Sequence, residues 1–406
     1  ETLSDVNIKR IIPFGEREIL IATDGKGIYR MNIDTCYAVP YIVADYNIHN
    51  GMNGNNINDV HVDHEGRIWI ANYPSGITIR DNRYSGYRWT RHSVGNRQSL
   101  VNNQVHDVIE DSEGDLWFGT SNGISLYSSA TGEWHSFFST FDHELEDKNH
   151  IFLTLCEISP GIILAGGFTS GLYQIDKRAL TVDYIASSLF FHLDLRPDQY
   201  IRDIRKDSEG NIWLSTHSGI SCFIESEQRF LNYDHKDGTL FGTYMNNSVG
   251  KAQDGTIYFG SINGVCYFNP KDRPSNIILP PVIFTDFKVY GRNPHEDAID
   301  TSIPMTNGKI MLNHNQNIFS ITFNVMNKSL QGKVEYAYKL EGLEENWINI
   351  GGDNQVTFRN IPYRNYKLHI KARYKNQEWQ TNYSTLFISI NPPFWLSWWA
   401  KLIYIV

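Results

Sequence analysis

The residues whose types and spacing suggest chemistry are aspartates that recur beside glycine and tryptophan. One turn is repeated three times, with the glycine three residues and the tryptophan six residues after the aspartate: Asp63, Gly66 and Trp69; Asp111, Gly114 and Trp117; Asp207, Gly210 and Trp213. Hydrolysis of a sugar needs two carboxyl groups that face each other across the scissile bond. No acidic pair stands out beyond the repeat, because Asp142, Glu144 and Glu146 fall in one loop that indicates solvated charge.

An architectural role explains the repeated turn without chemistry. Its aspartate can accept backbone N–H bonds and its glycine tolerates positive φ, so that together they close a tight turn. The tryptophan is expected to fill the space between neighbouring repeats. Sialidase-type propellers carry a turn in which aspartate and glycine are two residues apart, whereas the spacing is three here. A propeller glycosidase or lyase stays open as an alternative, as does a protein-binding scaffold.

Metal and cofactor sites find no support in the sequence. Four cysteines, Cys36, Cys156, Cys222 and Cys266, lie far apart and form no CxxC pair, which predicts buried free thiols. The histidines show neither HxH nor HExxH spacing, and the glycines recur in turns instead of forming a phosphate-binding loop. No metal and no cofactor are therefore predicted.

Ligand binding is the chemistry that the remaining residues favour. Loops between predicted strands are rich in asparagine with aromatic residues nearby, a combination that suits the hydroxyls and ring faces of a neutral or weakly charged carbohydrate. Asparagine also caps turns without any ligand. The candidate ligand-binding residues are Tyr73, Asn102, Asn122, Phe168, His217, Tyr244, Asn247 and Asn263.

The elements that carry these loops follow from an internal repeat. Glycines before a short apolar run recur at Gly27, Gly76, Gly123, Gly171, Gly219 and Gly264, at intervals of 45 to 49 residues. Each repeat contains about four alternating or buried runs, and four strands per repeat of this length are typical of one propeller blade. The fold class is therefore expected to be all-β, with six visible four-stranded blades of a β-propeller.

A second domain follows the repeats. They stop after Phe268, and a polar, proline-bearing segment then separates them from about seven new alternating runs, a pattern typical of an immunoglobulin-like β-sandwich. The expected domains are a propeller at 1–270 and a sandwich at 277–391. Residues 392–406 begin with prolines and tryptophans and end in an aliphatic run, which predicts the start of a transmembrane helix. A final strand with a tail is the alternative.

The repeats resemble a known family. Their pattern is similar to the two-component regulator propeller repeat of hybrid sensor histidine kinases. The tyrosine-rich stretches around Tyr336, Tyr338 and Tyr366 resemble the immunoglobulin-like module that follows such propellers. This resemblance covers nearly the whole chain. The six visible repeats depart from the family's usual seven. The resemblance therefore implies that they form part of a seven-bladed ring, with the missing blade expected from upstream sequence.

The resemblance implies a sensor, not an enzyme, in this segment. It implies an extracytoplasmic region in the bacterial periplasm, attached to the inner membrane through its C-terminal helix. That region would bind an oligosaccharide and signal to a cytoplasmic kinase, whose core is absent here, to control glycan-utilisation genes. An unclosed ring exposes strand edges, so a homodimer is expected. The net charge of −9 gives no basic surface for nucleic acid.

Overall fold

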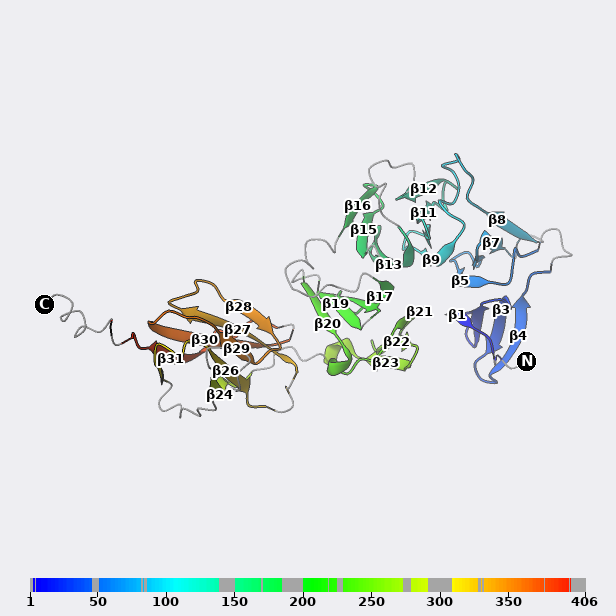
Figure 1. The fold of residues 1–406 in the computed structure, drawn as a ribbon. Helices are drawn as coiled ribbons and strands as arrows, with labels where there is room; N and C mark the ends of the chain where they lie inside the picture. Colours follow the sequence, from blue (N-terminus) through cyan, green and yellow to red (C-terminus); the bar gives the residue numbers. More distant parts are fainter. Residues whose placement is uncertain are drawn as a thin grey trace. The chain divides into compact units, whose positions relative to one another are not determined.

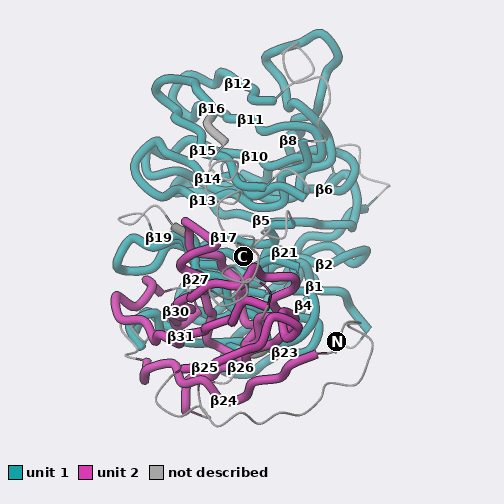
Figure 2. Tube along the Cα trace, turned by 60° about the vertical axis from the view of Figure 1, so that its left-hand side comes forward, with its two compact units in different colours: residues 1–273 teal, residues 274–406 magenta. Residues whose placement is uncertain are grey.

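The structure of the chain, a computed structural model, consists almost entirely of β-strands. It describes residues 3, 5–45, 51–81, 83, 86–138, 150–168, 171–184, 200–217, 219–224, 229–272, 279–290, 309–327, 330, 332–375, 377–393 and 395. The chain forms two compact units, unit 1 at residues 1–273 and unit 2 at residues 274–406 (Figure 2). The prediction of an all-β fold is confirmed.

Unit 1 contains six antiparallel sheets in its described residues, numbered here in chain order. Within each sheet the strands pair in sequence order, with the first strand toward the middle of the unit (Figure 1). Sheet 1 contains β1 (Ile8–Pro13), β2 (Glu18–Thr23), β3 (Ile28–Asn32) and β4 (Tyr37–Ile42); sheet 2 contains β5 (Ile57–Val62), β6 (Ile68–Asn72), β7 (Gly76–Arg80) and β8 (Tyr87–Thr90); sheet 3 contains β9 (Val105–Glu110), β10 (Leu116–Thr120), β11 (Gly123–Tyr127) and β12 (Trp134–Phe137).

The other three sheets follow the same order. Sheet 4 contains β13 (Phe152–Ser159), β14 (Ile162–Gly167), β15 (Leu172–Asp176) and β16 (Thr181–Tyr184); sheet 5 contains β17 (Ile201–Lys206), β18 (Ile212–Thr216), β19 (Ile220–Ile224) and β20 (Arg229–Tyr233); sheet 6 contains β21 (Tyr244–Lys251), β22 (Ile257–Ser261) and β23 (Gly264–Phe268). The expectation of four strands in every visible repeat is corrected for sheet 6, whose described part has three. The short 3-10 helices η3 (His235–Asp237) and η4 (Pro270–Asp272) flank this sheet in the sequence.

The repeated turn joins the first and second strands of sheets 2, 3 and 5. In sheet 3, the carboxylate of Asp111 accepts the backbone N–H groups of Glu113 and Asp115 and, at 2.9 Å, the indole N–H of Trp117. Gly114 has a φ of +86°, which only glycine adopts without strain. Asp63 and Asp207 hold their turns and tryptophans in the same way. The aspartate therefore fixes both the turn and the orientation of the indole ring.

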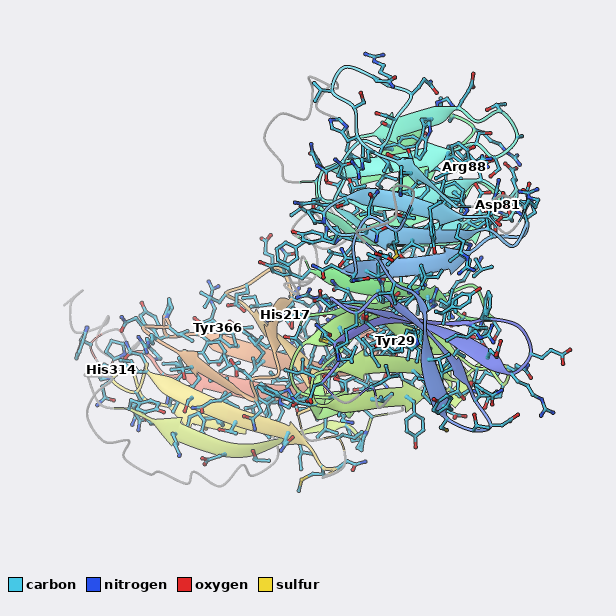
Figure 3. The ribbon with its side chains drawn as sticks, turned by 90° about the vertical axis from the view of Figure 1, so that its right-hand side faces the viewer. Tyr29, Asp81, Arg88, His217, His314 and Tyr366 are labelled. Carbon is cyan, nitrogen blue, oxygen red and sulfur yellow. The ribbon has the colours of Figure 1, made fainter. Side chains whose placement is uncertain are left out.

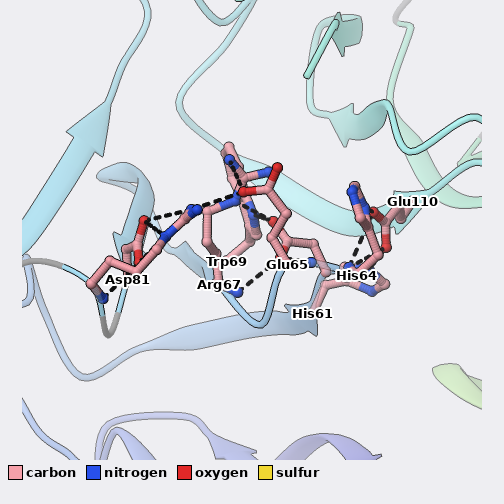
Figure 4. A network of polar contacts seen from close by, with 9 residues as sticks. His61, His64, Glu65, Arg67, Trp69, Asp81 and Glu110 are labelled. Atoms are coloured by element: carbon pink, nitrogen blue, oxygen red, sulfur yellow. Dashed lines mark hydrogen bonds and ion pairs between the residues drawn. The ribbon is translucent and has the colours of Figure 1, made fainter. Parts of the chain in front are cut away.

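The turn of sheet 2 is also tied to sheet 3. Glu110, at the end of β9, accepts the backbone N–H of His64 and contacts the side chains of His61 and His64 (Figure 4). Arg67 pairs with Asp63 at 2.5 Å and with Glu65 at 3.3 Å. Burial acts to raise the pKa of Asp63, but hydrogen bonds from Trp69 and Arg67 outweigh it, so this pKa lies below its usual value.

Each repeat tryptophan packs between its own sheet and the next. Trp69 lies in a buried cluster with residues of β9 and β10, Trp117 with residues of β13 and β14, and Trp213 with residues of β21 and β22. All three rings are at most 3% exposed. Sheet 6 differs, because Tyr258 occupies the tryptophan position and is 40% exposed. No described sheet covers this tyrosine as sheet 4 covers Trp117.

Unit 2 is a two-layer β-sandwich. One sheet has the order β24 (Val282–Val289), β26 (Phe319–Val325) and β29 (Gln355–Phe358); the other has the order β25 (Lys309–Leu312), β31 (Ser384–Ile390), β30 (Asn365–Tyr374), β27 (Val334–Glu341) and β28 (Ile348–Gly351). The strands pair antiparallel except β25 with β31, which are parallel. Alternate residues of both sheets meet in one core, as the burial of every second residue in β29 illustrates.

Two of the tyrosines expected to serve packing are buried in this core. Tyr336 and Tyr366 are each 3% exposed. The hydroxyl of Tyr336 donates to Asn324 at 3.0 Å, and that of Tyr366 donates to the backbone oxygen of Pro362 at 2.8 Å. Tyr366 lies among the strands of unit 2 (Figure 3). These tyrosines hold neighbouring loops and strands to the core through their hydroxyls.

The segment predicted to enter a membrane, 392–406, lies outside the described residues except for positions 392, 393 and 395. Among the residues that the structure describes, there is no helix of the length and apolar character needed to cross a bilayer.

Candidate functional site

A chain of polar contacts links the first strands of the six sheets. In each contact, the third residue of one first strand bonds a residue in the first strand of the following sheet. The contacts are Arg10 Nε to Asp59 Oδ1 at 3.2 Å, Val108 N to Asp59 Oδ2 at 2.8 Å, Leu155 N to Asp107 Oδ2 at 2.6 Å, Thr154 Oγ1 to Asp203 Oδ1 at 3.4 Å and Val249 N to Asp203 Oδ2 at 2.9 Å. This chain of contacts holds adjacent first strands together near the middle of unit 1.

The electrostatics of these contacts centre on Arg10. Burial raises the pKa values of Asp59, Asp107 and Asp203. For Asp107 burial is the largest cause and the charge of Asp59 the next, and together they raise its pKa from 3.8 to about 7. The pKa of Arg10 is raised, chiefly by Asp59 and also by Asp107 and Asp203. The charge of Arg10 thus acts on three buried carboxyl groups, and Asp203 is compensated more strongly by Arg205.

A cavity of about 700 Å³ opens beside these first strands. Its wall includes Asn58, His106 and Arg202, each of which directly precedes one of the three buried aspartates. Two further segments complete the wall, residues 7–11 around β1 and residues 243–250 around β21. Burial lowers the pKa of His106 to about 4, so its imidazole is neutral at pH 7 and bonds Ser121 Oγ at 2.8 Å.

Strand β21 bulges at the wall of this cavity. Tyr244 pairs with Ser261 and Val249 with Phe259, so that the four residues 245–248 stand opposite Gly260 alone. The comparable irregularities in β5, β9 and β17 leave only one extra residue. Bulges re-aim side chains and are common beside functional sites. We refer to residues 245–248 as the β21 bulge.

The β21 bulge reaches two other sheets. Asn247, in the left-handed region at φ 54°, donates from its side chain to the backbone oxygen of His106 in β9 at 3.2 Å. Asn246 accepts a hydrogen bond from Arg202 Nη1 in β17 at 3.2 Å. The side-chain oxygen of Asn247 is buried and has no hydrogen-bond partner among the described residues. Asn247 is therefore a cavity-wall residue that also links β21 to β9.

An aromatic group adjoins Arg202. The guanidinium carbon of Arg202 lies 5.7 Å from the centre of the Phe168 ring. Phe168 packs edge-on against Tyr200, with ring centres 4.7 Å apart. The ring of His217, labelled in Figure 3, is 5.9 Å from that of Tyr200, and its Nδ1 bonds Thr243 Oγ1 at 3.2 Å. The structure thus brings together Phe168 and His217, two of the residues predicted to bind ligand.

Two more predicted residues, Tyr244 and Asn247, are on the cavity wall. Tyr244 is fully buried, and its hydroxyl accepts the backbone N–H of Leu240, so its ring belongs to the core of sheet 6. Burial raises the pKa of Tyr244 to about 12. Of these two residues, Asn247 is the one that does not belong to that core.

The other four predicted residues lie in separate loops. Asn102 accepts the backbone N–H of Gln104, and Asn263 donates to the backbone oxygen of Phe241. Asn102 is therefore engaged in a local turn, whereas Asn263 links its loop to the segment before β21. Tyr73 is 40% exposed between β6 and β7, and Asn122 lies between β10 and β11. None of these four is on the cavity wall in the described part of the chain.

The wall residues that sequence reasoning missed are the ones that precede the buried aspartates. They are Asn58, His106 and Arg202. Each forms, with the aspartate after it, a polar pair inside an otherwise apolar strand, and a search of the sequence at the blade period would find these pairs. The expectation of buried thiols is confirmed for Cys222 only, because Cys156 and Cys266 are partly buried and Cys36 is exposed. The acidic loop around 142–147 lies outside the described residues.

Comparisons with known proteins match both units. The family model described as two component regulator propeller matches residues 51–73, 99–122 and 196–218, and the Y_Y_Y domain matches residues 327–391. These matches confirm the predicted resemblance.

Two proteins are similar over most of the chain. Histidine kinase P4 from Formosa agariphila is 27% identical over 349 residues, which are 83% of this chain and 24% of that protein. The crystal structure of the extracellular domain of a proposed hybrid two-component system from B. thetaiotaomicron is 30% identical, with a TM-score of 0.68. That match covers 96% of this chain and 56% of the other. The chain therefore spans about a quarter of the one relative and just over half of the other.

Proposed function

We propose that this chain, which belongs with the extracellular sensor regions of hybrid two-component systems, binds an oligosaccharide signal in the bacterial periplasm. The signal would pass through unit 2 and a membrane helix starting near residue 392 to a histidine kinase that controls glycan-utilisation genes. The whole protein's kinase activity is part of this proposal.

The cavity of unit 1 is the observation that carries the proposal. Its volume of about 700 Å³ is large enough for several sugar rings, and it falls in the usual range for ligand pockets, about 300–1,000 Å³. Four asparagines, Asn7, Asn58, Asn246 and Asn247, are on its wall. Amide groups both donate and accept hydrogen bonds, as recognition of sugar hydroxyls requires. No aspartate or glutamate is among the described residues of the wall, so the paired carboxylates of glycoside hydrolysis are not found there.

The proposal predicts saturable binding without cleavage. In calorimetric titration with a panel of plant and host oligosaccharides, one class is expected to bind and to be recovered intact. Asn247→Ala is expected to weaken that binding about tenfold, since an amide of the cavity wall and its bond to His106 are lost.

Asn263→Ala is the matched control, because Asn263 is not on the cavity wall and its side chain donates to the backbone oxygen of Phe241. Loss of binding in this control but not in Asn247→Ala would indicate that the ligand binds at the loops and not in the cavity. Cleavage of a sugar would show that the chain is an enzyme and not a sensor. If no sugar in the panel binds, the protein-binding scaffold is the remaining alternative.

We also propose a homodimer. Ile8 and Ile11 of β1 are 42% and 54% exposed, although β1 is the first strand of a sheet, and Tyr258 of sheet 6 is exposed as well. A further blade or a second copy of the chain would cover these residues. Sedimentation of the chain is expected to show dimers that dissociate on dilution, and monomer alone at all concentrations would contradict the dimer.

A further inference from the structure

The outer face of the five-stranded sheet of unit 2 gathers cations and aromatic rings. Alternate residues of β30 face the core, which leaves His369, Lys371 and Arg373 on the outer face. Lys371 Nζ lies 4.4 Å from the ring centre of Trp347 and 5.2 Å from that of Trp379. The guanidinium carbon of Arg373 lies 4.5 Å from the centre of the Trp379 ring. Both indole rings therefore make cation–π contacts with β30.

Tyr383 extends this group of rings along β30. Its ring centre lies 5.9 Å from that of Trp347 and 4.8 Å from that of His369, both edge-on, and 54% of the residue is exposed. The positions of His369 and Arg373 are four residues apart in one strand, a span of about 13 Å that a short oligosaccharide can follow. We name the following residues the aromatic strip: Trp347, His369, Lys371, Arg373, Trp379 and Tyr383.

The carboxylates on this face are already paired. The outward positions of the five strands hold two of them, Glu335 and Glu341. Glu335 pairs with Arg373 at 2.6 Å. Glu341 pairs with Lys367 at 3.2 Å and with His369 at 3.0 Å. Neither carboxylate is therefore left for the central lysine of the strip.

Lys371 is the cation of the strip that lacks an anionic partner. Among the residues that the structure describes, no carboxylate pairs with its ammonium group, and the charge of Arg373 lies nearby. Burial lowers the pKa of Lys371, and that charge lowers it further. A bound anion would act in the opposite direction, because an opposite charge favours the charged form of a lysine. The strip therefore offers one position at which an anionic group is favoured.

A sugar that carries an acidic group has both features that the strip can bind. The C–H face of a sugar ring packs on an aromatic side chain, and a carboxylate or a sulfate forms a charge-assisted hydrogen bond with an ammonium group. A nucleic acid fits less well, because it carries a phosphate at every nucleotide, whereas Lys371 is the one unpaired cation of the strip among the described residues.

We propose that the aromatic strip binds an acidic sugar chain, with a carboxylate or sulfate group on Lys371 and a sugar ring on Tyr383. This site is separate from the cavity of unit 1 and goes beyond the proposed function, in which the cavity binds the signal. The two sites can be tested independently, because none of the strip residues is on the cavity wall.

Surface plasmon resonance of the whole chain over immobilised sugars tests the proposal. The sugars are an oligogalacturonate, the same oligomer with methyl-esterified carboxyl groups, and a sulfated galactan oligosaccharide. We expect at least one of the two acidic sugars to bind at least about fivefold more tightly than the neutral ester, with an affinity that falls as salt is added. The stronger of the two distinguishes a carboxylate from a sulfate ester.

Two variants test the assigned roles. Lys371→Gln is expected to weaken binding of the acidic sugar about fivefold to tenfold and to change binding of the ester little. Tyr383→Ala is expected to weaken binding of both sugars about fivefold, because both lose the ring on which they pack. An unchanged melting temperature of each variant shows that its fold is intact.

Each variant has a matched control in unit 2. Lys288→Gln removes the same charge from the three-stranded sheet, where Lys288 pairs with Asp286 at 3.5 Å. Tyr363→Ala removes a tyrosine that is 52% exposed and is not part of the strip. Both controls are expected to bind the acidic sugar as the unmodified chain does.

Equal binding of the acidic and esterified sugars, equal affinities of Lys371→Gln and Lys288→Gln, or no binding of either acidic sugar overturns the inference. A single-stranded oligodeoxynucleotide that binds as tightly as the acidic sugar, and is weakened equally by Lys371→Gln, overturns it as well, because it would assign the strip to nucleic acid. The proposed function is judged separately by Asn247→Ala, which is expected to leave binding at the strip unchanged. Failure at the strip thus leaves the cavity in place, and failure at the cavity leaves the strip.

Discussion

Replacing Trp117 by alanine is expected to destabilise unit 1 by about 3–5 kcal/mol, the usual cost of removing a fully buried tryptophan. Trp117 is 0% exposed, stacks on Phe137 with ring centres 5.6 Å apart and packs into the core shared with sheet 4. The substitution also removes the indole N–H from the carboxylate of Asp111. Urea unfolding followed by circular dichroism measures the loss.

Tyr258→Ala is the control, because Tyr258 holds the same repeat position in sheet 6. Its ring is 40% exposed and stacks on Tyr267, which is itself exposed. We expect a cost of about 1 kcal/mol, typical of a partly exposed site. Similar losses in the two variants would show that coverage by the next sheet contributes little to the role of the tryptophan.

Replacing Arg10 by methionine is expected to cost about 3–5 kcal/mol at pH 8, because it leaves buried carboxylates without their cation. The guanidinium is 3.2 Å from Asp59 and also interacts electrostatically with Asp107 and Asp203. At pH 5 the loss is expected to be smaller, since the carboxyl groups can then take up protons in the folded state. Urea unfolding of both proteins at the two pH values gives the difference.

The sign of this pH dependence follows from Asp107. Its pKa is raised to about 7 in the folded chain from 3.8, so the folded state retains a proton that the unfolded state has released. This group therefore makes the unmodified protein less stable as pH rises from about 4 to about 7. Without Arg10 the pKa rises further and the decline continues to higher pH.

Arg17→Met is the control for this prediction. Arg17 is exposed and pairs with Asp34 on the surface, and loss of such a pair changes stability by less than about 1 kcal/mol. A loss in Arg10→Met that is small and equal at both pH values would show that the three aspartates are not coupled to Arg10.

The repeated turns could be predicted from the sequence because their interactions are local. Asp111, Gly114 and Trp117 lie within seven residues, so their spacing alone indicates the turn. In unit 2 the alternating runs predicted about seven strands, close to the three and five strands of its two described sheets.

The cavity is harder to predict because it depends on partners far along the chain. Asp107 is buried by its contact with Leu155, nearly fifty positions away, and the sequence of β9 does not specify that partner. The β21 bulge is harder still. Its residues become a bulge only through the pairing of Tyr244 and Val249 with β22, which their own sequence does not specify.

In the first strands, adjacent residues have two different roles: one residue lines the cavity and the next joins neighbouring sheets. In Asn58-Asp59, His106-Asp107 and Arg202-Asp203, the second residue joins neighbouring sheets and the first is on the cavity wall. Mutations at the first position can therefore change what the cavity recognises while the joints between sheets persist. A lineage that carries this arrangement could acquire new ligands by changing a few single residues, with little risk to its folding.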